Sequence, residues 1–140
     1  MWDLVFQAAA ALLVGAAVGY GVAAIIDALS KAFAELWKNM VAEAKAIFGY
    51  ISEATQHYLA LIAQFLDTNW SDIGAYLRAE LGYSSDWLVA VFQQGQEVFL
   101  AFANPQTYQE QSRTISVGIA EDQAQLPGEQ NPIITRLKLA

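Results

Sequence analysis

Cysteine is absent from this chain, and histidine occurs only once, at His57. Without cysteine the chain has no disulfide, no thiolate nucleophile, no iron–sulfur ligation and no cysteine zinc site. A catalytic triad or a histidine metal centre needs partner residues that a single histidine does not supply. We therefore expect no catalytic residues, no metal site, no cofactor and no enzymatic activity. We expect His57 to lie on the surface of a helix.

Charged residues are also scarce, at 15% of the 140 residues, whereas about 25% is typical of globular proteins. The balance is acidic, with a formal net charge of −7. A protein that neutralises phosphates needs a basic surface, and nothing in this composition provides one. We therefore exclude nucleic acid as a partner.

The longest stretch without any charge runs from residue 4 to residue 26. As an α-helix rising about 1.5 Å per residue, this run would be roughly 34 Å long, which exceeds a bilayer core of about 30 Å. We therefore predict an apolar, transmembrane-type helix over residues 1–28, with the lipid bilayer as a partner. Burial of the same helix in the core of a protein assembly is the alternative.

Small residues recur at every fourth position of this run, at Ala11, Gly15, Gly19 and Ala23. Small side chains allow two helix backbones to approach closely, which is the basis of GxxxG association. We predict that these four residues form a helix-association face and that the partners are copies of the chain. Packing of this face within one chain is the alternative.

Residues 29–67 are predicted to form an amphipathic helix, because their apolar residues recur at intervals of three or four. No proline precedes Pro105 and no capping box separates this helix from the first, so the pattern allows one helix from about residue 3 to about residue 66. If the helix is broken, Gly49 is the expected break. The predicted packing stripe consists of Leu29, Phe33, Leu36, Met40, Ile47, Ile51, Tyr58, Ile62 and Phe65.

The rest of the chain is divided into two predicted segments. Residues 68–104 are predicted to be a two-helix packing segment: a turn over 67–72, a short helix ended by Gly82, and a helix over 86–103. Residues 105–140 are predicted to be a polar extended tail with weak strand signals over 114–120 and 132–139. We expect a neighbouring copy to order this tail. The predicted fold class is all-α with a minor β-like tail.

These features favour a non-enzymatic structural subunit of a membrane-embedded or filamentous homo-oligomer. The layout of an apolar helix continuing into an amphipathic one resembles that of pilin-like filament subunits, which implies a long N-terminal helix in a filament core. Two other functions fit the same pattern: a membrane-permeabilising protein, and an accessory subunit of a larger membrane complex. The predicted location is a membrane, with the N-terminus outside and the C-terminus cytoplasmic, or an extracellular or virion-type assembly.

Overall fold

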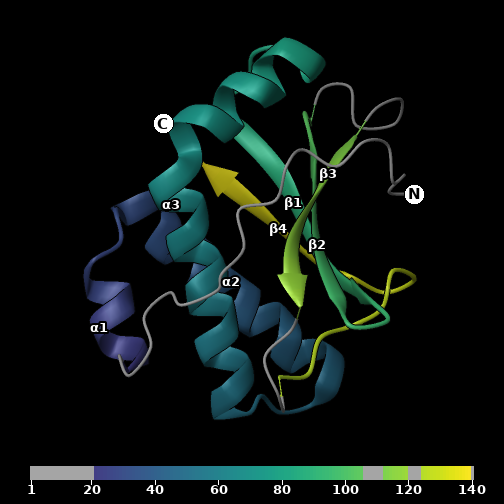
Figure 1. The fold of residues 1–140 in the computed structure, drawn as a ribbon. Coiled ribbons are helices and arrows are strands. Elements are labelled where there is room, and N and C mark those ends of the chain that lie inside the picture. The colour runs from purple at the N-terminus through teal and green to yellow at the C-terminus, as the bar shows by residue number, and fades with distance from the viewer. Residues whose placement is uncertain (1–20, 106–111, 120–123, 140) are drawn as a thin grey trace.

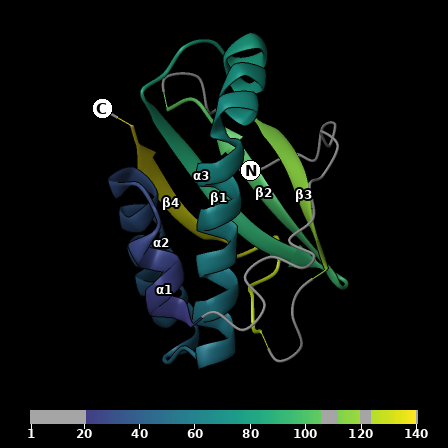
Figure 2. The same cartoon turned by 60° about the vertical axis from the view of Figure 1, so that its left-hand side comes forward.

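The computed structural model describes residues 21–105, 112–119 and 124–139, which form a helical layer packed on one face of a β-sheet (Figures 1 and 2). Three helices come first in the chain and four strands follow. The helices are α1 (Val22–Asp27), α2 (Lys31–Phe48) and α3 (Glu53–Leu81). The strands are β1 (Asp86–Gln94), β2 (Glu97–Ala103), β3 (Arg113–Ile119) and β4 (Ile133–Lys138).

The prediction of an all-α fold is wrong, because residues 86–103 form the β1–β2 hairpin and not a packing helix. Apolar residues occupy consecutive positions here, and a short apolar run buried on two sides has the same pattern in a helix and in a strand. Gly95 decides between the two. It adopts a φ of +62° in a two-residue turn, where glycine has no steric penalty.

The sheet is antiparallel with the strand order β3-β2-β1-β4. Both strand predictions for the tail are confirmed, since they correspond to β3 and β4. β4 pairs with β1 along its length, in a register that places Ala90 opposite Ile134 and Val91 opposite Ile133. Of the two tail strands, β4 is thus ordered by β1 and β3 by β2 of the same chain, and no neighbouring copy is needed to order them.

The single helix from about residue 3 to about residue 66, which the pattern allowed, is not formed. Gly21 is extended, so residues 4–26 do not form a single helix, and Ser30 is extended between α1 and α2. The alternative break at Gly49 is confirmed: Gly49 ends α2 with a left-handed φ of +82°. Ser52 then starts α3 by accepting a hydrogen bond from the backbone amide of Thr55 at 3.1 Å.

The turn predicted over residues 67–72 is absent, because α3 continues through it to Leu81. Two of the polar side chains that suggested a turn are hydrogen-bonded to backbone groups. Asn69 donates to the carbonyl of Phe65 at 2.9 Å, and Asp67 accepts from the backbone amide of Ser30 at 2.8 Å. Burial of Leu66 and Leu77 on either side of this region favours the continuous helix.

The core lies between the helices and the facing side of the sheet. Trp70 of α3 is in ring contact with Phe33 of α2, at a centroid distance of 5.8 Å, and with Phe102 of β2, at 6.3 Å. All nine residues of the predicted stripe belong to this core or pack against it. The stripe therefore joins the helices to the sheet of the same chain.

In the described ranges, no helix has the length and apolar character needed to cross a bilayer. This finding contradicts the predicted transmembrane helix as far as the described residues extend. Residues 4–20 of the uncharged run lie outside them.

Candidate functional site

The predicted association face reaches the described part of the chain only at Ala23, since Ala11, Gly15 and Gly19 lie outside it. Ala23 is exposed on α1, and so is its neighbour Ala24. Ile25, two positions on, is 2% exposed and packs against Ala60 and Leu61 of α3. One side of α1 thus packs against α3, and the side that carries Ala23 and Ala24 is exposed to solvent.

The extended backbone at Gly21 limits this face, because a single helix does not carry Gly19 and Ala23 together. The predicted packing stripe, in contrast, lies in the core between the helices and the sheet. Leu36, Met40 and Ile62 are fully buried, and three of the nine stripe residues, Leu29, Ile47 and Ile51, are partly buried against the same core, so most of the stripe is not available to a neighbour.

The sheet has a second apolar face, turned away from the helices, which was not predicted from the sequence. Ala90, Phe92, Phe99 and Ala101 form a separate buried cluster there, and the rings of Phe92 and Phe99 stack at 5.7 Å. None of the helices in the described ranges lies over this side of the sheet (Figure 2). In the sequence, apolar residues occupy both odd and even positions of 87–92 and 98–103, a pattern that fits strands buried on two sides as well as a buried helix.

A polar groove of about 390 Å³ lies between α2 and the end of β4. Three cationic side chains line it, together with one carboxylate, one amide and two apolar side chains. The lining residues are Lys31, Ala32, Glu35, Asn39, Arg136, Lys138 and Leu139. No sequence motif marks this groove, because about a hundred residues separate its two walls.

Two carboxylates hold the ends of the elements around this groove. Asp67 of α3 accepts from both the backbone amide and the hydroxyl of Ser30, the residue that precedes α2. Asp86 of β1 lies 3.4 Å from Arg136 of β4, measured between Oδ2 and Nη1. The other oxygen of Asp86, Oδ1, is buried without a hydrogen-bond partner.

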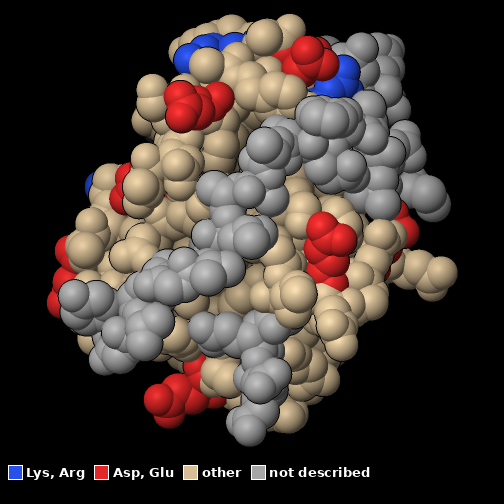
Figure 3. Space-filling view, viewed as in Figure 1, with Lys and Arg blue, Asp and Glu red and all other residues tan. Residues whose placement is uncertain are grey.

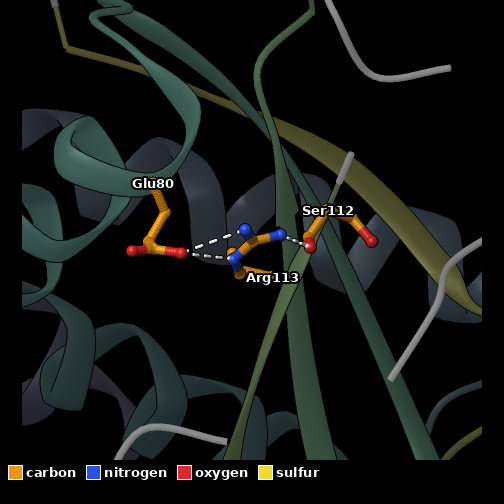
Figure 4. Close-up of polar contacts among 3 residues, drawn as sticks. All are labelled: Glu80, Ser112 and Arg113. Carbon is orange, nitrogen blue, oxygen red and sulfur yellow. Dashed lines mark hydrogen bonds and ion pairs between the residues drawn. The ribbon is translucent and has the colours of Figure 1, made fainter. Parts of the chain in front are cut away.

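Outside the groove, a polar cluster joins the last turn of α3 to β3 (Figure 4). Arg113 donates from Nε and Nη2 to one oxygen of Glu80, each at 3.0 Å, and from Nη1 to the carbonyl of Ser112 at 2.8 Å. Burial raises the pKa of the nearby Tyr76 phenol; Arg113 opposes this shift and Glu80 adds to it. Each guanidinium nitrogen of Arg113 already has a partner, so this cluster is a structural link between α3 and β3.

The remaining candidates for a chemical site are His57 and the acidic side chains. His57 is half-buried on α3. Within residues 21–105, 112–119 and 124–139, no group of three or more His, Asp or Glu side chains is arranged to hold a metal ion. On the face of the molecule seen in Figure 3, acidic side chains occur in several separate places and cationic side chains lie mainly at the upper end.

In comparisons with known proteins, no family model, no curated protein and no solved structure matches the chain.

Proposed function

We propose that this protein is a non-enzymatic structural subunit that assembles with copies of itself through the small-residue side of its N-terminal region. The observation that carries the proposal is the orientation of α1. Ile25 attaches α1 to α3, whereas Ala23 and Ala24 face outward. An exposed surface of alanines lets a second backbone approach closely, so that many weak dispersion contacts accumulate.

The position of the packing stripe supports this assignment by elimination. Leu36, Met40 and Ile62 are enclosed in the core of their own chain, so an assembly has to use another surface. The exposed side of α1 is such a surface, and the uncharged residues that precede it in the sequence have the same small-residue composition, with Gly19, Gly15 and Ala11. In this proposal the described part of the association surface is the side of α1 that carries Ala23 and Ala24.

The test compares the molar mass of the full chain with that of two alanine-to-arginine variants, by sedimentation equilibrium. Ala23→Arg places a long charged side chain on the proposed surface, so we expect the oligomer to dissociate to monomers. Ala42→Arg is the matched control, because Ala42 is an exposed alanine on α2, away from that surface. We expect it to retain the oligomer.

Two results would contradict the proposal. One is a wild-type chain that stays monomeric at every concentration measured. The other is equal dissociation of the Ala23→Arg and Ala42→Arg oligomers. Co-purification with a different protein at fixed stoichiometry, in place of self-association, would instead identify an accessory subunit of a larger complex.

A further inference from the structure

The groove between α2 and β4 gathers positive charge in an acidic protein. Lys31, Arg136 and Lys138 line it, which is three of the seven lysines and arginines in a chain of net charge −7. Cations that share one hollow repel each other, and a nearby anion removes this cost. The distribution therefore indicates an anion as the ligand.

The two lysines have no competing partner in the described part of the chain. Arg136 is engaged by Asp86 at 3.4 Å, but no ion pair of the described residues involves Lys31 or Lys138. Glu35 is the one carboxylate among the lining residues. Two ammonium groups, each with three N–H donors, thus remain available on opposite walls of the groove.

The rest of the lining suits the polar body of a small molecule. The Asn39 amide both donates and accepts, and the Glu35 carboxylate accepts hydrogen bonds from hydroxyl groups. Ala32 and Leu139 add two short apolar contacts. The volume of about 390 Å³ lies in the range of about 300–1,000 Å³ that is usual for small-molecule sites.

We propose that this groove binds a small organic phosphate monoester whose body carries hydroxyl groups. A phosphate carries about −1.5 to −2 charges at pH 7 and has three acceptor oxygens, so it has enough charge and enough acceptors for two ammonium groups. The hydroxyl groups of the ligand lie toward Glu35 and Asn39. This site is separate from the proposed association surface on α1.

The test is calorimetric titration of the full-length protein with glucose 6-phosphate, inorganic phosphate and glucose at low salt. We expect saturable binding of glucose 6-phosphate, severalfold weaker binding of inorganic phosphate, and none of glucose. Binding should also weaken as salt is added, because the site is exposed. Absence of saturable glucose 6-phosphate binding would overturn the proposal, and so would equal affinity for any two of the three probes.

A pair of double variants locates the binding. In Lys31→Gln with Lys138→Gln, both free ammonium groups of the groove are lost, and we expect the affinity for glucose 6-phosphate to fall about tenfold or more. Lys38→Gln with Lys45→Gln changes the net charge equally on exposed positions of α2 outside the groove, so its affinity should stay within about twofold. Equal loss in both double variants would show that the chain binds anions through its overall charge and would overturn the site.

Discussion

The two faces of the sheet are both apolar on β1 and β2, but they pack against different parts of the molecule. The face toward the helices carries large side chains, with Trp87, Leu100 and Phe102 in one core that includes α2 and α3. The opposite face carries a small cluster in which two alanines flank the stacked Phe92 and Phe99. The first face connects every layer of the described fold, whereas the second connects neighbouring strands.

This difference shows where the stability of the fold originates. Removing a side chain from the helix-facing core leaves a cavity between layers, which rigid elements on both sides cannot easily close. Removing one from the second face affects a cluster of four residues in two adjacent strands. We therefore expect the same chemical change to cost more on the first face than on the second.

The largest predicted effect comes from Phe102→Ala. Phe102 is fully buried in contact with Trp70, so truncation should lower the free energy of unfolding by about 3–5 kcal/mol. Phe99→Ala is the matched variant on the same strand, facing the opposite way at 7% exposure, and should cost about 2–3 kcal/mol. Urea denaturation measures both values. A larger loss for Phe99→Ala would reverse the ranking of the two faces.

The turn between α2 and α3 tests how closely the helix-facing core depends on helix placement. Gly49→Ala puts a Cβ at a φ of +82°, which should lower stability by about 1 kcal/mol. Gly21→Ala is the control, because Gly21 has a φ of −77° and free space around it. Thermal denaturation should show a lower midpoint for Gly49→Ala alone, and equal midpoints would show that the turn is not strained.

A smaller effect is expected where α3 is linked to β3 by charge. Glu80→Gln removes the ion pair with Arg113, which is partly exposed and hence worth about 0.5–1 kcal/mol. The loss should shrink at high salt, in contrast to the salt-independent loss in Phe102→Ala. Denaturation at low and high salt measures this, and an unchanged loss at both would exclude a mainly electrostatic link.

The smallest effect is a pH dependence at Tyr76. Burial raises the pKa of this phenol above its ordinary value of 10.0, so the folded state keeps a proton that the unfolded state loses. The contribution of Tyr76 to the free energy of unfolding is therefore fully present below about pH 10 and should decline as the pH rises further. In Tyr76→Phe this part of the decline should disappear, whereas Tyr83→Phe, at a 76% exposed position, should leave it in place. Identical pH profiles for the wild type and Tyr76→Phe would contradict the shift.

The sequence predicted the helical layer better than the sheet. The spacing of Phe33, Met40 and Ile62 marked them as apolar helix positions, because helical periodicity is a local property of the chain, and all three are buried in the core, although on two helices and not on one. The hairpin was missed because Trp87 to Phe92 is apolar at every position, and only pairing with β2 and β4 distinguishes a strand there. The groove could not be predicted from the sequence for a related reason: Lys31 and Lys138 line the same groove only because β4 pairs with β1 beside α2.

Disulfide trapping tests the central claim, association through the small-residue side of α1, most directly. The chain has no cysteine, so Ala23→Cys and Ala42→Cys each introduce a single thiol at an exposed alanine. A disulfide forms only where two Cα atoms come within about 4.4–6.8 Å, which a close helix contact provides. Under mild oxidation the account predicts a covalent dimer for Ala23→Cys and monomers for Ala42→Cys. Monomers for both variants, or dimers in equal yield, would contradict it.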